Sequence, residues 1–482
     1  MFSGTTNIPE DKKEPTAKIV ADVALPPVKA FITAEGHGRN TTGGRGYPPV
    51  FVTNLNNSGS GSLREALSGG NRIVVFRVGG TITITSDLVV SGSNITIAGQ
   101  TAPGGGITVY GDITYFTGEN IIVRHMRFRA GDPVAGLDTD TFRIQSQSNA
   151  GTWENYIMDH CSFSWSSDEN VSIETGTSGN VHVNNVTFQN CIFSEGFDSR
   201  NMILWGKNIT NISVIRNYFA NTQQRNIRAS VAGNVSWEQI NNFVYNYGIA
   251  VNPSNKHKVD VIGNVFEDGP ATQLVNTINF DECSASNCPP SGDTDFTGTA
   301  LYHTDNTFNG GPISVSGNVS SYTTGAPNLS SGYSALASSV VKDSVLVNAG
   351  ARVGLPGGRD ALDTHVINDG YNGTGSWPSN EAATSGLPTI SNGTPYTDAN
   401  NDGIDDSWSS THGISSPSQV KSSYTINGDN IDNSEGWSAM DVFLGYLAND
   451  MDNLEPSLEP EPEPFPIPQS KLTKKRLTKI GL

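Results

Sequence analysis

The sequence predicts an all-β protein built as a right-handed parallel β-helix, and two observations predict it. In Asp159–Ile173, apolar and polar residues alternate with period two before an acidic turn and a second short strand. The first half of this stretch recurs, each copy having a polar amide or imidazole followed within three residues by an aromatic or apolar residue. These polar positions, spaced by 35, 30, 27, 25 and 22 residues, are His125, His160, Asn190, Asn217, Asn242 and Asn264. Such short strands bury their apolar faces by stacking, which would align the polar side chains in a ladder.

The remaining elements are expected in the following order. Residues 1–29 lack periodicity and should form a linker. Ser62 and Glu65 have the spacing of a capping box, so a short helix should span Ser62–Leu67 and cover the first coil. Coils should continue to about Asn348, and their first strands are expected at Ile73–Val78, Thr81–Ile84, Asn94–Ala98, Ile107–Tyr110 and Ile121–Phe128.

Shifts in composition suggest the domain boundaries. The β-helix is expected to occupy residues 30–375, and a linker rich in Gly, Ser and Asn residues 376–395. Residues 396–452 should form a compact acidic appendage with a calcium-loop pattern. Residues 453–482 combine an extended Pro- and Glu-rich linker with a basic tail.

The composition restricts the classes of function. Apolar residues make up 35% of the 482 residues and charged residues 16%, with 52 glycines, as in a chain rich in turns and strands. A net charge of −18 provides no basic field for phosphates, so we expect no nucleic-acid partner. No apolar run is long enough to span a membrane, and no signal peptide is visible. We expect a monomer.

The four cysteines do not form a disulfide framework. Cys161 and Cys191 occupy equivalent positions of the repeat and should lie on neighbouring coils, more readily as buried thiols than as a bridge. Cys283 and Cys288 are close in sequence and could close a small surface loop in an oxidising compartment.

Several motifs resemble secreted bacterial pectate lyases of polysaccharide lyase family one. In chain order they are Thr41–Gly46, Val52–Leu55, Gly61–Leu67, Ile97–Gly104, Asp159–Ser162, Ser167–Glu169 and Arg359–Asp363. The resemblance covers about residues 31–370. It implies a secreted, calcium-dependent enzyme that cleaves polygalacturonate (pectate) or a related 4-linked polyuronate by β-elimination.

The candidate metal site consists of Asp138, Asp140, Asp168 and Glu169. In an Asp-x-Asp pattern on a strand both carboxylates point to one face, and a neighbouring coil can add further oxygens, which Ca²⁺ prefers as ligands. The resemblance matches the first three residues to acidic ligands of the family, whereas a further family aspartate falls near Ser172. A solvated acidic turn is the alternative.

The candidate basic site lies in the segment from Arg225 to Arg228. This segment resembles the one that carries the family's catalytic arginine and a substrate-binding arginine, so Arg225 is the expected base and Arg228 the expected clamp for a substrate carboxylate. The family's usual proline falls at Ile227. A family lysine is missing, and Arg200 is its candidate replacement. Two surface arginines in a turn are the alternative.

The resemblance also implies the reaction. The C5 proton of a uronate becomes acidic only when the charge of its own carboxylate is neutralised, which calcium and Arg228 would do. Arg225 would take the proton, and the C4–O bond would break to leave an unsaturated sugar. Because a guanidinium is normally always protonated, nearby cations must poise Arg225 for this role.

The appendage contains a second candidate calcium site. Oxygens stand at positions 1, 3, 5 and 9 of a loop with glycine at position 6: Asp398, Asn400, Asp402 and Asp406. Ser409 replaces the final glutamate of a sensor EF-hand, so the loop resembles thrombospondin-type or dockerin-type loops. A linker rich in Asn and Asp is the alternative.

Two other functions remain open. A β-helix glycoside hydrolase would use paired carboxylates such as those of Asp138, Asp140 and Asp168 as acid and base. It would need no calcium and form no unsaturated product. A non-catalytic carbohydrate-binding β-helix would form no product at all.

Overall fold

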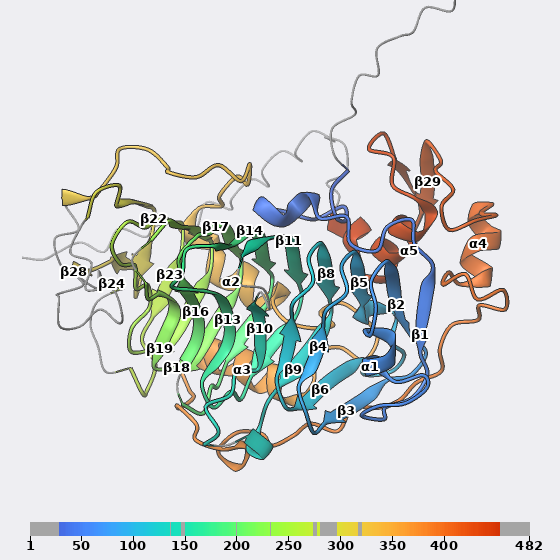
Figure 1. The fold of residues 1–482 in the computed structure, drawn as a ribbon, viewed down its shortest axis with the longest axis horizontal. Helices are drawn as coiled ribbons and strands as arrows, with labels where there is room; N and C mark the ends of the chain where they lie inside the picture. Colours follow the sequence, from blue (N-terminus) through green and yellow to red (C-terminus); the bar gives the residue numbers. More distant parts are fainter. Residues whose placement is uncertain are drawn as a thin grey trace, which may run out of the picture.

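The computed structural model is a parallel β-helix, as the repeat predicts (Figure 1). The structure describes residues 28–134, 136–145, 150–198, 200–231, 233–272, 277–279, 296–316 and 321–453. The chain winds through three sheets, which we name A, B and C, and each coil stacks on the previous one. The coils progress from β1 at one end of the molecule to β25 and β26 at the other.

Sheet A has ten strands, and neighbouring strands pair in parallel: β1 (Pro49–Val52), β2 (Arg72–Phe76), β5 (Ile95–Ala98), β8 (Ile121–Arg124), β11 (Gly151–Asp159), β14 (Val181–Gln189), β17 (Ile209–Ile215), β20 (Val235–Ile240), β22 (Lys258–Ile262) and β25 (Ala300–Thr304). Sheet C has six: β4 (Leu88–Val90), β7 (Thr114–Phe116), β10 (Phe142–Gln145), β13 (Glu169–Gly176), β16 (Arg200–Gly206) and β19 (Gln224–Ala229).

Sheet B also has ten strands, of which the last pairs antiparallel: β3 (Gly80–Ile84), β6 (Ile107–Gly111), β9 (Met126–Arg129), β12 (Ser162–Ser164), β15 (Ile192–Ser194), β18 (Tyr218–Thr222), β21 (Phe243–Tyr247), β23 (Val265–Glu267), β26 (Thr307–Phe308) and β27 (Gly311–Pro312). Two small pairs complete the strands: β24 (Ile278–Asn279) with β28 (Val315–Ser316), and β29 (Ser423–Ile426) with β30 (Asp429–Asp432).

A single residue in the left-handed conformation turns the chain from sheet A to sheet B in seven successive coils. The φ angles lie between 48° and 60° at His125, His160, Asn190, Arg216, Asn241, Gly263 and Asp305. Gly, Asn, Asp and His adopt this conformation more readily than most residues do. The turn at residue 125 also divides the stretch Ile121–Phe128, expected as one strand, into β8 and β9.

The amide ladder lies one residue beyond these turns. The Nδ2 atoms of Asn217, Asn242 and Asn264 donate to Oδ1 of the next ladder residue at 2.9–3.0 Å, ending at Asn306. Our expectation of one shared ladder was therefore wrong for His125, His160 and Asn190, which stand at the turn. Cys161 and Cys191 precede the asparagines at the ladder position, and they are buried, unbridged thiols as expected. Cys283 and Cys288 lie outside the described residues.

Stacked phenylalanine rings fill the interior behind sheet B. The ring centroids are 5.6 Å apart for Phe128 and Phe163, 5.2 Å for Phe163 and Phe193, and 4.6 Å for Phe193 and Phe219. Each ring comes from the same position of a successive strand and is fully or almost fully buried. Strand stacking thus turns a sequence repeat into a continuous aromatic core.

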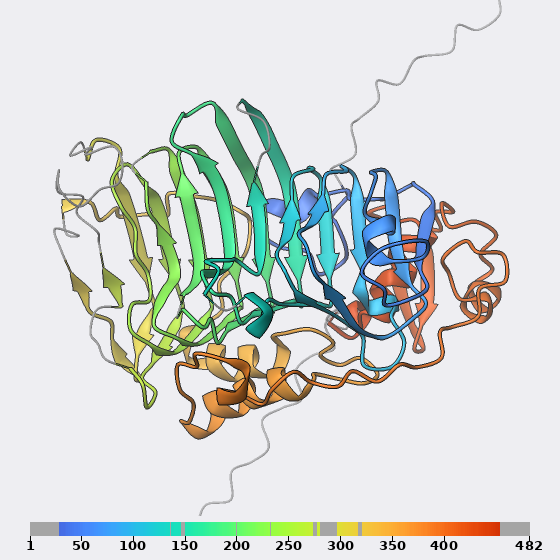
Figure 2. The same ribbon diagram turned by 60° about the horizontal axis from the view of Figure 1, so that its bottom comes forward.

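Helices cover the outside of the coils. The expected short helix is α1 (Leu63–Ala66), whose N-cap Ser62 accepts a hydrogen bond from the backbone of Glu65. Residues expected to form the last coils instead form α2 (Ser338–Asn348), which packs with α3 (Ala361–Asn372) on the outer face of sheet B (Figure 2). Short 3₁₀ helices are η1 (His37–Asn40), η2 (Gly99–Thr101), η3 (Asp132–Val134), η5 (Glu381–Ala383) and η6 (Asp450–Asn453).

The chain then returns along the outside of the coils to their first end, where the appendage lies (Figure 2). Its helices are α4 (Asp406–His412) and α5 (Ala439–Leu447). The apolar face of α5 shares a buried cluster with the outward side chains of β2 and β5, including Ile73, Val75 and Ala98. The appendage therefore docks on the coils, as the apolar sequence of α5 allows.

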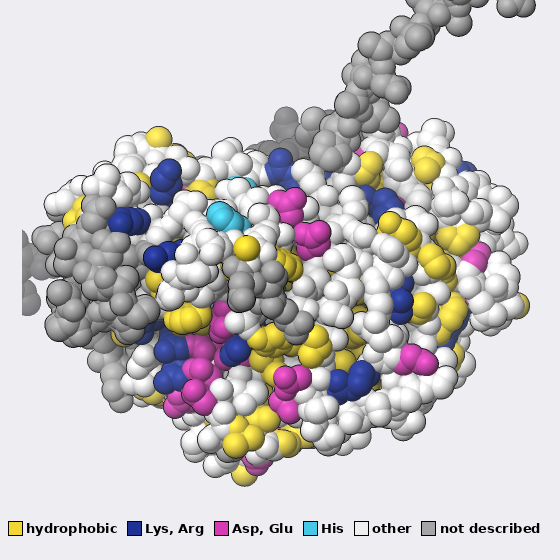
Figure 3. All heavy atoms as spheres, in the orientation of Figure 1, with side chains coloured by type: hydrophobic (Ala, Val, Ile, Leu, Met, Phe, Trp, Pro, Cys, Tyr) yellow, Lys and Arg dark blue, Asp and Glu magenta, His cyan; other side chains and the backbone are white. Residues whose placement is uncertain are grey.

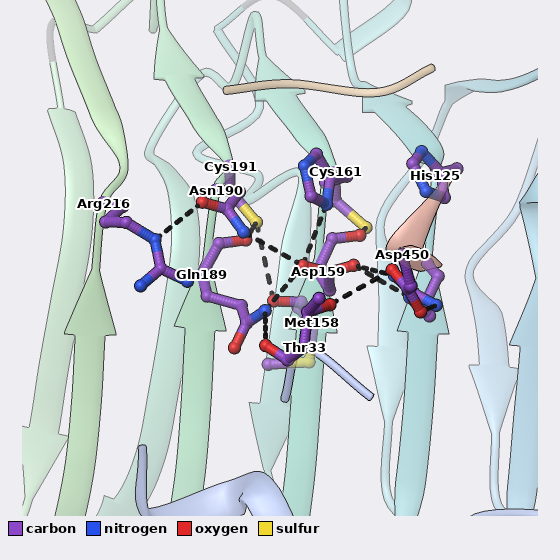
Figure 4. Close-up of polar contacts among 12 residues, drawn as sticks. Thr33, His125, Met158, Asp159, Cys161, Gln189, Asn190, Cys191, Arg216 and Asp450 are labelled. Carbon is purple, nitrogen blue, oxygen red and sulfur yellow. Dashed lines mark hydrogen bonds and ion pairs between the residues drawn. The ribbon is translucent and has the colours of Figure 1, made fainter. Parts of the chain in front are cut away.

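A buried polar network fastens the segments around Thr33 and Asp450 to the middle coils (Figure 4). Arg124 lies 2.6 Å from Asp159 and 2.8 Å from Asp450 of the appendage. Gln189 donates to Asp159 at 2.8 Å and to the carbonyl of Thr33 at 3.1 Å. These charges are paired and hydrogen-bonded, as buried charges must be. None of the described helices is long and apolar enough to cross a membrane.

Candidate active site

Three neighbouring strands of sheet C carry four of the expected site residues, Glu169, Arg200, Arg225 and Arg228. Glu169 at the start of β13 pairs with Arg200 at the start of β16, which pairs with Gln224 at the start of β19. Arg225 is the next residue of β19 after Gln224. Residues far apart in the sequence are thus brought to one edge of sheet C. Figure 3 shows acidic and basic side chains gathered on the face over these strands.

A second amide ladder lies beneath this edge. Asn170 donates to Asn201 and Asn201 donates to Asn226, both at 2.7 Å, and Asn226 donates to the carbonyl of Ile249 at 2.9 Å. All three asparagines are buried. Because each directly follows one of the edge residues, their hydrogen bonds fix the spacing of the strands that carry Glu169, Arg200 and Arg225.

Three carboxylates converge at this edge. Asp140, Asp168 and Glu169 each place an oxygen within 4.8 Å of the other two. Asp140 and Glu169 are buried, whereas the Asp168 side chain is 19% exposed and opens into a groove of about 410 Å³. Four of the groove's lining residues are acidic and two are arginines: Asp138, Asp168, Glu169, Glu174, Arg200 and Arg225.

Asp138 and Asp140 differ in their surroundings. They lie before β10 rather than on a strand, and the left-handed conformation of Asp138 (φ 55°) leaves its side chain 80% exposed. Asp140 is fully buried and accepts hydrogen bonds from the backbone of Glu169 at 3.0 Å, from Arg143 and from Ser172. Burial raises the pKa of Asp140, against the opposing effect of Arg143. The expected pairing of Asp138 and Asp140 on one strand face is therefore wrong.

The backbone at the candidate base is in unusual conformations. Arg225 has φ 59° and Ile227 has φ 139°, a value that is rare for a β-branched residue. Such conformations cost about 1–3 kcal/mol each and occur mainly at functional sites. Proline, which requires φ near −65°, cannot adopt the conformation seen at Ile227. The departure from the family pattern at this position therefore agrees with the local backbone.

The Arg225 guanidinium lies among the clustered carboxylates. It contacts the Glu169 carboxylate, and its Nη1 is 3.6 Å from Oδ1 of Asp168. Burial lowers the pKa of Arg225, and Arg228 adds to this effect, while Asp168 opposes it. A guanidinium with a lowered pKa is closer to what a proton acceptor requires than an exposed one is.

The other two arginines take different positions. Arg200 contacts Asp168, lies 2.7 Å from Asp198 and reaches within 3.8 Å of Asp138, so it faces the groove. Arg228 pairs in register with Ile203, which lines the same groove. The structure thus brings Arg200 and Arg225 to the acidic cluster, with Arg228 further along the face of sheet C.

The sequence is similar to two fungal proteins, each named probable pectate lyase C. The Aspergillus flavus protein is 35% identical over 390 residues, which are 78% of this chain and 86% of that protein. The Emericella nidulans protein is 33% identical over 434 residues, which are 87% of this chain and 92% of that protein. This chain belongs to the pectate lyase family. The resemblance found in the motifs is thereby confirmed.

Similar solved structures have lower sequence identity. Jun a 1, the major allergen from cedar pollen, is 20% identical, with a TM-score of 0.49 over 66% of this chain and 92% of that one. A pectate lyase from Bacillus sp. N165 in complex with trigalacturonate is 18% identical, with a TM-score of 0.49 over 66% of this chain and 99% of that one. A scan against models of protein families gives no match.

The acidic cluster of this pectate lyase family member fits a calcium ion in its donor set. Asp140, Asp168 and Glu169 offer only carboxylate oxygens, which Ca²⁺ prefers. Hydrogen bonds orient the Asp140 carboxylate but leave it able to bind a cation, because a carboxylate has about four lone-pair directions. Asp138 lies outside the cluster but lines the same groove.

Three residues on the outer face of sheet C were not among the site residues expected from the sequence. Trp205 is 38% exposed and pairs in register with Glu174, and both line the groove. Arg143 bridges Asp140 at 2.7 Å and Glu174 at 3.4 Å. Alternation within β13 and β16 could have placed Glu174 and Trp205 outside. Their proximity to the acidic cluster required the register of the coils.

In the candidate calcium loop of the appendage, acidic side chains accept hydrogen bonds from the loop's own backbone. Asp398 accepts hydrogen bonds from the backbone N–H groups of Asp402 and Gly403 at 3.0 and 2.8 Å. Asp406 accepts from the backbone of Ala399 at 3.1 Å, and Asn400 donates to Asp402 at 3.0 Å. Asp398 also pairs with Arg77 of the β-helix, so one expected ligand already has a cationic partner.

Proposed function

We propose that the protein is a secreted pectate lyase that cleaves polygalacturonate, or a related 4-linked polyuronate, by calcium-assisted β-elimination. One observation carries the proposal: the guanidinium of Arg225, whose pKa is lowered by burial, lines the same groove as Asp168 and Glu169, two of the three converging carboxylates. Family membership supports the same reaction. Since a polymer does not cross a membrane, the enzyme would act outside the cell.

The proposed cation site consists of Asp140, Asp168 and Glu169. A Ca²⁺ ion there would neutralise substrate carboxylate charge and bridge a polyanion to an acidic protein. Asp168 is the most accessible of the three carboxylates. Asp138, exposed at the groove, is placed to contribute only at its rim.

The arginines would accept the proton and bind the substrate carboxylates. Arg225 accepts the C5 proton, for which its lowered pKa is the supporting observation. Arg228 and Arg200 bind substrate carboxylates, and Arg200 substitutes for the family's missing lysine. Fixed positive groups that meet developing charge stabilise the transition state more than the ground state. The indole of Trp205 offers an apolar surface on which a sugar ring stacks.

The assay that tests the proposal measures ultraviolet absorbance of the unsaturated uronate formed from polygalacturonate, with calcium and with a chelator. Absorbance should rise with calcium and stay flat with the chelator. New reducing ends without a rise in absorbance would show hydrolysis instead. Absence of any product on polygalacturonate and on other 4-linked polyuronates would leave a binding protein as the explanation.

Asp140 is a poor candidate for the acid of a hydrolase. A hydrolase needs one protonated and one ionised carboxyl group, usually about 5 Å or more apart, with the acid able to reach the glycosidic oxygen. Asp140 has a raised pKa but is fully buried and held by Arg143. It therefore cannot approach a substrate without rearrangement.

We also propose that the loop around Asp398, Asn400, Asp402 and Asp406 holds a structural calcium ion. Its oxygens point into the loop and already accept backbone hydrogen bonds, as in loops that wrap a cation. The Arg77 pair with Asp398 competes with this role. Thermal stabilisation by calcium that depends on Asp402, measured with an Asp402→Ala variant, would support the site.

A further inference from the structure

A second group of metal-ligating side chains lies between sheet B and helix α3. Glu195 directly follows β15, and His365 and Asp369 lie one turn apart on α3. His365 Nε2 is 3.7 Å from Oε1 of Glu195 and 3.6 Å from Oδ2 of Asp369. One ligand atom from each residue lies within 4.8 Å of the other two. The group shares no residue with the calcium site proposed above.

The buried Glu195 carboxylate is the independent observation that points to a ligand. Glu195 is 2% exposed, and its Oε2 atom is buried with no partner at hydrogen-bond distance among the described residues. Burial and Asp369 raise the pKa of Glu195 to about 8. The nearby Trp165 and Asn221 side chains lower this pKa but do not outweigh burial, so the neighbouring groups do not compensate the buried charge. A buried carboxylate oxygen left unsatisfied is costly, whereas a bound cation would satisfy it. His365 is 42% exposed, so an ion could enter from solvent.

The supporting residues orient Asp369 as a ligand. Its Oδ1 accepts a hydrogen bond from Thr374 at 2.6 Å and its Oδ2 accepts one from Asn221 at 2.8 Å. Asn221 is itself held by Asn246, whose Nδ2 donates to it at 2.8 Å. Outer hydrogen bonds of this kind fix the direction of metal ligands in proteins.

We propose that Glu195, His365 and Asp369 form a site for a divalent transition-metal ion of the Zn²⁺ class, which fastens α3 to sheet B. Imidazole nitrogens and carboxylate oxygens both ligate such ions, whereas calcium prefers oxygens alone. A tetrahedral ion with bonds of about 2.1 Å separates its ligands by about 3.4 Å, close to the distances observed. Solvent would supply the fourth ligand on the side of His365.

The test is a titration of the full-length, chelator-washed protein with Zn²⁺ in the presence of excess calcium, which keeps the oxygen-only sites occupied. We expect one equivalent of Zn²⁺ to bind by calorimetry and to raise the melting temperature. His365→Ala should weaken binding at least about 100-fold, and Asn221→Ala, which removes only an outer hydrogen bond, about 10- to 100-fold.

The matched control is His182→Ala, which removes an exposed histidine on β14. This variant should bind Zn²⁺ like the wild type. Equal affinity in wild type and His365→Ala would overturn the proposal, as would failure of the wild type to bind Zn²⁺. Lyase activity of His365→Ala should be unchanged, because His365 lies outside the groove of the catalytic site.

Discussion

At the scale of single residues, burial and the surrounding carboxylates determine the basicity and the position of the Arg225 guanidinium. Burial makes the guanidinium less basic, and the contacts with Asp168 and Glu169 hold it in place. Those same carboxylates are the proposed calcium ligands. A cation there would share them with Arg225 and so add to the positive field that favours its neutral form.

Asp168 provides the cleanest test of the metal site. Asp168→Asn should raise the calcium concentration needed for half-maximal activity by about tenfold, because one ligand charge is lost. The melting temperature should change little, since the side chain is partly exposed. Calcium titrations of lyase rate and thermal melts of both proteins measure this.

Asp140→Ala is a contrasting variant. The carboxylate of Asp140 is fully buried and bonds to Arg143, Ser172 and the Glu169 backbone, so its removal should lower stability as well as calcium affinity. An Asp168→Asn protein with unchanged calcium dependence would move the metal site elsewhere.

Trp205 tests the role of the groove beyond the reacting centre. Trp205→Ala should raise KM about two- to tenfold through loss of stacking, with little effect on kcat. Val89→Ala is the matched control, because it truncates another exposed apolar side chain of sheet C. Kinetics on polygalacturonate would exclude a substrate contact at Trp205 if both variants kept the wild-type KM.

At the scale of elements, asparagine ladders set the spacing of the coils. The Oδ1 atom of Asn242 accepts from both the backbone and the side chain of Asn217, and its Nδ2 donates to Asn264. Asn170, Asn201 and Asn226 form a second ladder of side-chain hydrogen bonds below the candidate active site. The ladder thus links the fold to the placement of the charged groups.

Asn242→Ala should cost about 2 kcal/mol or more of the free energy of unfolding, because it leaves buried amide groups without partners. Asn348→Ala, at the exposed end of α2, is the control and should change stability little. Denaturant unfolding measures both. A small effect at residue 242 would show that the ladder is dispensable.

The sequence predicted the strand repeat, the first helix and the buried cysteines, because these follow from local alternation, capping and equivalent repeat positions. It failed at His125, His160 and Asn190, because these coils have their polar residue at the turn, whereas Cys161 and Cys191 occupy the ladder position that asparagine fills in later coils. Helix α2 was mistaken for coils. The separate surroundings of Asp138 and Asp140 depend on a left-handed backbone at residue 138, which spacing alone does not reveal.

At the scale of the whole molecule, the appendage and the N-terminal segment stabilise the first coils. Helix α5 covers the apolar outer face of β2 and β5, and Asp450 pairs with the buried Arg124. Asp441 pairs with Arg45 at 2.8 Å. None of these residues lies in the groove of the candidate active site, whose charged groups belong to β13, β16 and β19 and to the loops before β10 and β13.

Truncation after Ser391 should therefore lower the melting temperature while preserving lyase activity on soluble substrate. The exposed faces of β2 and β5 and the loss of Asp450 as a partner of the buried Arg124 account for the lower melting temperature. Melts of both proteins, with calcium and with chelator, also test the second calcium loop. Full-length protein should show the larger calcium-induced rise, and equal rises would place all stabilising calcium in the β-helix.

The most direct test of the central claim is the rate at which ultraviolet absorbance rises on polygalacturonate at saturating calcium, compared between wild type and Arg225→Lys. Lysine keeps the positive charge but not the position or the lowered pKa of the guanidinium. We expect absorbance to rise with the wild type and the rate of the variant to be at least about 100-fold lower, with similar melting temperatures. A variant rate equal to that of the wild type would contradict the assignment of Arg225 as the base.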